Sequence, residues 1–219
     1  MEIRVNGVSI HYEKTGAAGP SMLLLHGNGE DSRIFDAIAP KLSETFTIYA
    51  IDSRNHGLSQ KTGIYSYQTM SEDIHAFIKA LNLDGAHIIG FSDGAIVGLT
   101  LAMQHGGIIG KMALLGINLK PEDFTEEAYQ YVKSTYEETN DPLFKLMLEQ
   151  PRIELDDIRH VSNPILVVAA GNDIYRQDTF QQLAEALPDA ALKIMQGHDH
   201  GSYIINQDIL LDDFLRFFR

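Results

Sequence analysis

Continuous apolar runs alternate with helical patterns along this chain from residue 20 onward, and this alternation restricts its fold more than any other feature. A run that is apolar at every position suits a strand buried on both faces, which is typical of a parallel sheet covered by helices. The expected strands are Ser21–Leu25, Phe46–Ile51, Ala86–Ile89, Met112–Ile117, Ile165–Ala170 and Ala191–Met195. The expected helices include Ser32–Leu42, Met70–Leu81 and Ile204–Phe218. The sequence therefore predicts an α/β fold with a mostly parallel central sheet and helices on both faces.

Two segments depart from this alternation. Near the N-terminus, residues 3–5 and 8–12 flank Asn6-Gly7, a dipeptide typical of a two-residue hairpin turn, so an antiparallel pair is expected there. Residues 120–163 have no strand pattern, and they combine many acids with aromatic residues. A connection of that length usually carries its own structure, so we expect two or three helices inserted over the sheet.

The pentapeptide Gly90-Phe91-Ser92-Asp93-Gly94 joins the expected strand at 86–89 to a helical pattern at 95–104. A G-x-S-x-G between a strand and a helix makes a turn so tight that the serine backbone is strained and its hydroxyl stands exposed. With 18 glycines in the chain, a chance match is easy, so the pattern depends on its context and partners. In this context we predict that Ser92 is a nucleophile.

A nucleophilic serine needs a histidine base, and the histidine needs an acid that orients it. In sheets of this kind such groups follow the carboxyl ends of strands. Asp173 follows the run that ends at Ala170, and His198 and His200 follow the last expected strand. Asp173 could instead cap a helix that starts near Gln177. Glu185 and Asp189 lie on or after that helix and are interpreted as surface charges.

Acyl transfer also needs donors for a developing oxyanion. The backbone N–H of Asp93 is one candidate, because it directly follows Ser92 at the expected helix start. The second candidate is the backbone N–H of Asn28, in the loop His26-Gly27-Asn28-Gly29 after the first buried strand.

Taken together, these motifs resemble the α/β-hydrolase superfamily over nearly the whole chain. The residues that carry the resemblance are Leu25–Gly29, Asp52–Ser59, Gly90–Gly94, Gly171–Asp173 and the histidine-rich turn near residue 200. The resemblance implies an α/β-hydrolase fold in one domain over residues 1–219, with a small helical lid at 120–163. It also implies a serine, acid and histidine in that order along the chain, and a structural role for the loop at 52–59.

The resemblance further implies that the catalytic histidine precedes a closing helix that ends in a short apolar pair. Counted back from Phe217-Phe218, His200 matches this spacing better than His198, although Gly197-His198 imitates a common Gly-His motif. We therefore favour the set Ser92, Asp173 and His200. The dehalogenase and epoxide-hydrolase branches, which use an aspartate nucleophile, are disfavoured because position 92 is serine.

Composition limits the partners. The net charge is −13, which disfavours nucleic acid, anionic membrane surfaces and polyanionic substrates. Cysteine is absent, so disulfides and thiolate sites are excluded. The first seven residues do not resemble a signal peptide, and no apolar run reaches the roughly 20 residues that span a bilayer. We expect a cytoplasmic protein that acts on a small molecule, with homodimer formation left open.

No cofactor and no metal are expected. His198 and His200 could share one face as metal ligands, but no H-E-x-x-H pattern supplies further ligands. His26 and His56 are interpreted as hydrogen-bonded loop residues. The remaining histidines are isolated in the sequence and are interpreted as core or surface residues; they are His11, His75, His87, His105 and His160.

The function that fits these residues best is hydrolysis of a small or medium neutral carboxylic ester through an acyl-enzyme. The same three groups also serve C–C bond hydrolases, amidases or peptidases, and cofactor-free perhydrolases. A ligand receptor built on the same fold, with little or no turnover, is a further alternative. Aromatic residues of the insertion could line an acyl pocket or pack between its own helices.

Overall fold

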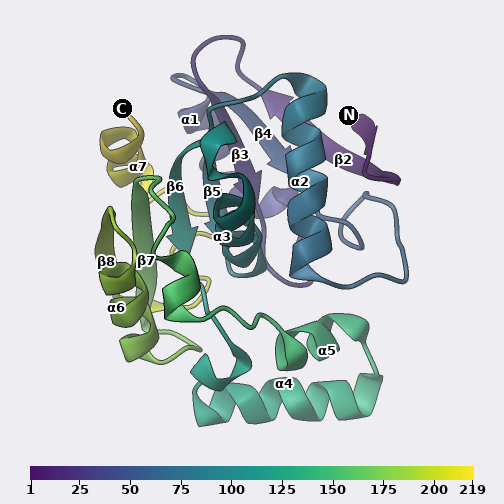
Figure 1. Cartoon of the computed structure of the whole chain (residues 1–219), viewed down its shortest axis with the longest axis vertical. Helices are drawn as coiled ribbons and strands as arrows, with labels where there is room; N and C mark the ends of the chain where they lie inside the picture. Colours follow the sequence, from purple (N-terminus) through teal and green to yellow (C-terminus); the bar gives the residue numbers. More distant parts are fainter.

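An eight-stranded sheet forms the centre of the molecule (Figure 1), and the computed structural model describes all residues from 1 to 219. The strand order is β1-β2-β4-β3-β5-β6-β7-β8. The strands are β1 (Glu2–Val5), β2 (Val8–Thr15), β3 (Ser21–Leu25), β4 (Thr47–Ile51), β5 (Ala86–Phe91), β6 (Ile109–Leu115), β7 (Ile165–Asn172) and β8 (Ala190–Asp199). β1 and β2 form an antiparallel hairpin, β2 joins β4 antiparallel, and all other pairs are parallel. The predicted fold class is confirmed.

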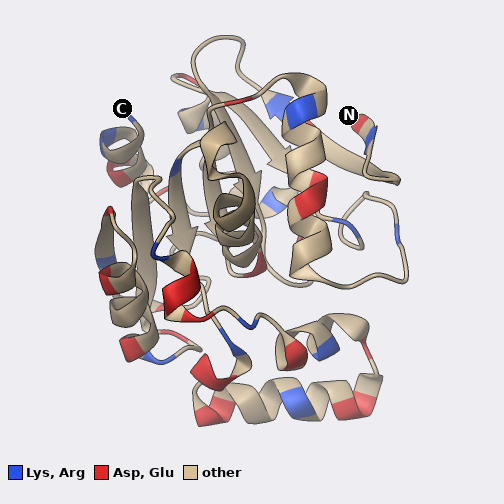
Figure 2. Ribbon diagram, viewed as in Figure 1, with Lys and Arg blue, Asp and Glu red and all other residues tan.

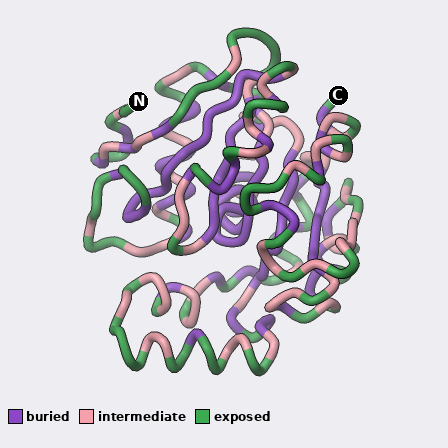
Figure 3. Tube along the Cα trace, turned by 180° about the vertical axis from the view of Figure 1, so that it is seen from behind, coloured by how far each residue is buried: buried purple, intermediate pink, exposed green.

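Helices cover both faces of the sheet, because alternate strand residues point to opposite sides. Leu23 and Leu25 face a core shared with α2 (Tyr67–Leu81), α3 (Asp93–His105) and α6 (Gln177–Ala186). Met22 and Leu24 face a second core that contains the 3₁₀ helix η1 (Ser32–Phe35), α1 (Ala39–Leu42) and α7 (Leu211–Phe218). Figure 3 shows the buried stretches of the trace in purple, gathered at the centre of the molecule.

The register aligns the carboxyl ends of the central strands. Leu25 of β3 pairs with Gly90 of β5, Phe91 pairs with Leu115 of β6, and Leu115 pairs with Val168 of β7. The loops that follow these residues therefore leave the sheet at one edge. Asn28, Ser92 and Asp173 follow β3, β5 and β7 there, and Asp93 begins α3. His200 follows β8, whereas His198 lies within it.

The insertion between β6 and β7 consists of η3 (Pro121–Asp123), α4 (Glu126–Thr139), α5 (Pro142–Glu149) and η4 (Leu155–Ile158). Thr125 and Asp141 cap the starts of α4 and α5 through their side chains, and Asn140 ends α4 in the left-handed conformation. α4 and α5 lie beyond the carboxyl edge of the sheet (Figure 1). Acidic residues cluster toward both ends of α4 (Figure 2), and only Val132 is buried in this helix.

Two expected helices are shorter than the sequence predicts. The segment 32–42 is split into η1 and α1, because Pro40 in the first turn of α1 has no N–H to bond the preceding turn. The closing helix spans only Leu211–Phe218, because residues 201–206 form turns and Asn206 adopts a left-handed φ of 53°. β8 is longer than expected and continues to Asp199, while α2 begins at Tyr67 rather than Met70.

No helix of the structure combines the length and the apolar character that crossing a membrane requires.

Candidate active site

Ser92, His200 and Asp173 lie together at the carboxyl edge of the sheet. Ser92 Oγ lies 3.2 Å from His200 Nε2, and His200 Nδ1 lies 2.7 Å from Asp173 Oδ1. With its proton on Nδ1, the imidazole donates to Asp173 and accepts from the Ser92 hydroxyl at Nε2. The three residues come from separate connections, after β5, β7 and β8. The arrangement has the geometry of a nucleophile, a base and an orienting acid.

The turn around Ser92 is strained in the manner that its sequence predicts. Ser92 has φ 51° and ψ −116°, outside the regions that L-residues favour. A side chain at Gly90 would overlap the Gly94 carbonyl, and one at Gly94 would overlap the Leu25 carbonyl at the end of β3. The two glycines therefore allow α3 to start directly against β3 and β5, with Ser92 at its N-terminal end.

The side chain of Asp173 is completely buried, and its carboxylate accepts hydrogen bonds from main-chain donors. Its Oδ2 accepts from the amide of Ala170 at 3.1 Å, and its Oδ1 accepts from the amide of Tyr175 at 3.3 Å. It does not cap α6, whose first turn follows Arg176. The rings of Phe91 and Tyr175 lie 5.0 Å and 5.4 Å from the imidazole of His200. These contacts fix the orientation of His200, whose side chain is 17% exposed.

Gly116 is a site residue that the sequence analysis missed. It follows β6 with φ 56°, and a Cβ at this position would lie 2.7 Å from His200 Cε1 and 2.9 Å from His200 Nδ1. The absence of a side chain leaves the space that the imidazole occupies. Its signal in the sequence is only a glycine after a buried strand, which many loops share.

Asn28 and Asp93 are joined through their side chains as well as placed near Ser92 through the backbone. Asn28 Nδ2 donates to Asp93 Oδ2 at 2.9 Å and to the carbonyl of Leu143 in α5 at 3.2 Å. Tyr67 Oη donates to Asp93 Oδ1 at 2.8 Å. The backbone N–H of Asn28 has no acceptor in the chain, and that of Asp93 lies in the first turn of α3, where no intrahelical acceptor exists. Both amides are thus available to a bound oxygen.

Two further carboxyl groups near these amides have unusual titration. Burial raises the pKa of Asp93 above its ordinary value, although Tyr67 and Asn28 donate hydrogen bonds to its carboxylate. Burial also raises the pKa of Glu30 to about 7, against the opposing effect of the Gly27 amide that donates to it at 2.9 Å. Both shifts arise because a charged carboxylate loses its hydration when it is buried.

The other sequence candidates lie where they take no part in these contacts. His198 Nδ1 lies 3.2 Å from Ser202 Oγ, at the end of β8. His26 and His56 contact backbone groups, as expected: His26 Nε2 accepts from the Ser53 amide at 3.0 Å, and His56 Nδ1 lies 2.9 Å from the Arg54 carbonyl. Glu185 and Asp189 are exposed.

The loop at 52–59 is held in place by hydrogen bonds and a buried ion pair. Asp52 accepts from the amides of Ser32 and Leu58, at 2.9 Å and 2.8 Å. Arg54 forms a buried pair with Asp73 of α2, with Nε 2.5 Å from Oδ2. This network fastens the loop to η1 and α2.

Ser92 is only 5% exposed, and the three larger cavities are lined by other residues. One of 570 Å³ runs between the loop near Thr62 and Tyr136 of α4, and one of 490 Å³ lies near Phe124 and Tyr129. A third, of 530 Å³, includes Gly29 and Glu30. None of the three is lined by Ser92 or His200.

Comparison with known proteins shows the family and the fold of the chain. The family described as alpha/beta hydrolase fold matches residues 20–146, more than half of the chain. The uncharacterized hydrolase YraK of Bacillus subtilis (strain 168) is 34% identical over 106 residues, which cover 47% of this chain and 39% of that protein. A fluoroacetate dehalogenase of Burkholderia sp. is 28% identical over 127 residues, which cover 55% of this chain and 41% of that protein. The matched part is thus less than half the length of either relative.

A solved structure matches the whole chain. The enol-lactonase from Burkholderia xenovorans LB400 superposes with a TM-score of 0.83 and covers 100% of this chain and 99% of that one, at 20% identity. At this identity the likeness concerns the fold.

Proposed function

We propose that this chain, which belongs to the alpha/beta hydrolase fold family, is a hydrolase that cleaves small or medium neutral carboxylic esters through an acyl-enzyme. The observation that carries the proposal is the continuous hydrogen-bonded set Ser92–His200–Asp173, with Oγ–Nε2 and Nδ1–Oδ1 distances of 3.2 Å and 2.7 Å. A nucleophilic serine forms an acyl-enzyme when it attacks the carbonyl carbon of its substrate.

In the first half of the reaction, Ser92 Oγ attacks the ester carbonyl carbon while its proton passes to His200 Nε2. The resulting imidazolium is stabilised by its hydrogen bond to Asp173. The negative charge that develops on the carbonyl oxygen is held by the amides of Asn28 and Asp93. His200 then gives its proton to the alkoxide, the carbon–oxygen bond to it breaks, and the alcohol leaves.

In the second half, water replaces the alcohol. His200 Nε2 takes a proton from this water, whose oxygen attacks the acyl carbon bound to Ser92. The same two amides hold the second oxyanion. When it collapses, the bond between the acyl carbon and Ser92 Oγ breaks, and His200 returns its proton to Oγ. The carboxylic acid is released and the starting state is restored.

The charge around the site favours a neutral substrate. Asp93 and Glu30 both lie beside the oxyanion amides, so an anionic acyl group would meet two carboxyl groups there. Asp93 is buried and accepts a hydrogen bond from Tyr67, so its side chain has a structural role and is not a second base.

We propose that residues 1–219 form one hydrolase domain and that the insertion at 120–163 is its lid. The Leu143 carbonyl of α5 accepts a hydrogen bond from Asn28, in the loop after β3. Phe124 forms an isolated β-bridge with Tyr175, whose ring contacts that of His200. Because Ser92 is nearly covered, an acyl group of medium length requires α4 and α5 to move outward.

Labelling with a fluorophosphonate, followed by turnover of p-nitrophenyl esters of increasing chain length, tests the proposal. Wild type is expected to label covalently and to prefer short or medium esters, whereas Ser92→Ala should not label and should lose at least about 10⁴-fold in turnover. Folded wild-type protein that fails to label would contradict the nucleophile and favour a receptor. Labelling without ester turnover, but with cleavage of amides or 1,3-diketones, would contradict the ester assignment alone.

A further inference from the structure

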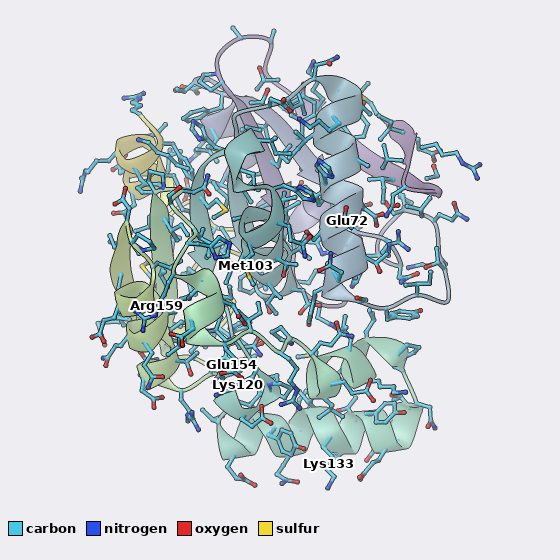
Figure 4. All side chains as sticks on the ribbon, viewed as in Figure 1. Glu72, Met103, Lys120, Lys133, Glu154 and Arg159 are labelled. Carbon is cyan, nitrogen blue, oxygen red and sulfur yellow. The ribbon has the colours of Figure 1, made fainter.

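Glu72, His75 and His105 form a side-chain cluster on the outer surface of α2 and α3, apart from the site described above. Glu72 and His75 are three residues apart on α2, so they share one face, and His105 is the last residue of α3. Figure 4 labels Glu72 on α2 and Met103 near the end of α3, on the same side of the sheet. The sequence analysis interpreted both histidines as core or surface residues, isolated in the sequence, and the fold brings them together at the surface.

The donor atoms of the cluster converge. His75 Nδ1 and His105 Nε2 each lie 3.7 Å from a carboxylate oxygen of Glu72. One ligand atom from each of the three residues lies within 4.8 Å of the other two. The imidazole rings are stacked, with centroids 3.8 Å apart and an interplanar angle of 13°.

We propose that Glu72, His75 and His105 bind a divalent transition-metal ion, with Zn²⁺ as the best fit, in a site that joins α2 to the end of α3. Two imidazoles and one carboxylate are a ligand set that zinc accepts, with water at the fourth position. Bonds of about 2.05 Å in a tetrahedron place donor atoms about 3.3 Å apart. The two 3.7 Å separations involve different oxygens of Glu72, and the three ligand atoms lie within 4.8 Å of one another, so metal binding requires them to close by up to about 1.5 Å. The two imidazoles also have to turn out of their stacked arrangement, because each binds a metal in the plane of its own ring.

The surroundings of the cluster suit a cation. The ion-pair partners of Glu72 are the two histidines, with no lysine or arginine among them. Gln68 Nε2 donates to Glu72 Oε1 at 3.2 Å, which orients the carboxylate from the side. The side chains of Glu72, His75 and His105 are 39%, 27% and 30% exposed, so an ion can reach them from solvent.

The position of the site separates it from catalysis. α3 begins beside Ser92 and ends at His105, so its 13 residues place the two ends about 18 Å apart. A metal at this end would hold α2 against α3 and stabilise the folded state, with no contact to the reacting atoms. Chelation should therefore leave labelling of Ser92 by fluorophosphonate unchanged.

The test uses tag-free protein stripped with a chelator and titrated with Zn²⁺ by calorimetry, with Co²⁺ as a spectroscopic probe. We expect saturation at one equivalent and the visible bands of four-coordinate Co²⁺. At free Zn²⁺ about 100-fold above Kd, the melting temperature should rise by about 5–10 °C. Since the chain has no cysteine, thiolate binding cannot imitate these signals.

Matched variants decide whether the cluster is responsible. His75→Ala, His105→Ala and Glu72→Gln should each abolish the Co²⁺ bands and the thermal shift, and Gln68→Ala should weaken binding by about 10-fold. His160→Ala removes an exposed histidine outside the cluster and should bind as wild type does. Absence of a saturable site, or an equal loss in His160→Ala, would mean adventitious binding only and would overturn the proposal.

Discussion

Asn28 Nδ2 donates to Asp93 Oδ2 at 2.9 Å, and this bond ties the loop after β3 to the residue that follows the nucleophile. The same amide reaches the Leu143 carbonyl in α5 at 3.2 Å. One side chain thus connects the two amides proposed for the oxyanion and the insertion above them. The spacing between these amides depends on it.

Replacing Asn28 by alanine is expected to lower ester kcat/KM by about 10- to 100-fold, because the backbone N–H remains but its position is no longer held. The loss should fall mainly on kcat. Gln181→Ala provides a comparison, since Gln181 is exposed on α6 and lies outside these contacts. Steady-state kinetics on one ester measures both effects, and an Asn28→Ala enzyme with wild-type kcat would contradict the positioning role.

Gly116→Ala should displace His200, because the added Cβ would lie 2.7 Å from His200 Cε1 and the backbone φ is 56°. We expect a fall of about 100-fold in kcat/KM with a loss of only about 1–2 kcal/mol in the free energy of unfolding. Gly107→Ala is the control, since nothing lies within 4 Å of a Cβ there. A wild-type kcat/KM in Gly116→Ala would contradict the prediction that the space beside Gly116 is needed to position His200.

The two neighbouring histidines should differ sharply in turnover. His200→Ala removes the base that contacts Ser92 at 3.2 Å, so ester turnover should fall at least about 10⁴-fold. His198→Ala removes contacts with Ser202 Oγ and the Tyr203 ring but none with Ser92, so turnover should stay within about tenfold of wild type. Loss in His198→Ala with retention in His200→Ala would reverse the choice of base.

The strands and the order of the site residues could be predicted because their signals are local. Each central strand is an uninterrupted apolar run, and the Gly90–Gly94 turn carries its steric demand in its own five residues. Asn6-Gly7 likewise predicts its turn, since both residues adopt a positive φ. Parallel pairing then brings the strand ends together without further information.

The remaining features depend on contacts between distant segments. Nothing near Gly116 in sequence indicates that His200 would occupy the space beside it, and nothing near Asn28 indicates a bond to Leu143. His75 and His105 approach each other only because α2 and α3 pack side by side. Ile204 and Leu210 matched a helical spacing, but they pack into the second core from turns instead.

Glu30 makes stability depend on pH, because burial raises its pKa from 4.5 to about 7. Between these two values the folded protein keeps a proton that the unfolded chain has lost. The contribution of this proton is therefore complete below pH 4.5 and is lost as the pH rises through 7. Glu30→Gln keeps an oxygen that can accept from the Gly27 amide but cannot ionise.

Glu30→Gln should consequently be more stable than wild type by about 2 kcal/mol at pH 8, with little difference at pH 4.5. Urea unfolding at the two pH values measures this change. Glu185→Gln, which removes one exposed carboxylate from this acidic chain, controls for the loss of a negative charge. An advantage of Glu30→Gln that is equal at both pH values would exclude titration as its cause, and one that is larger at pH 4.5 would mean that folding lowers the pKa of Glu30 instead.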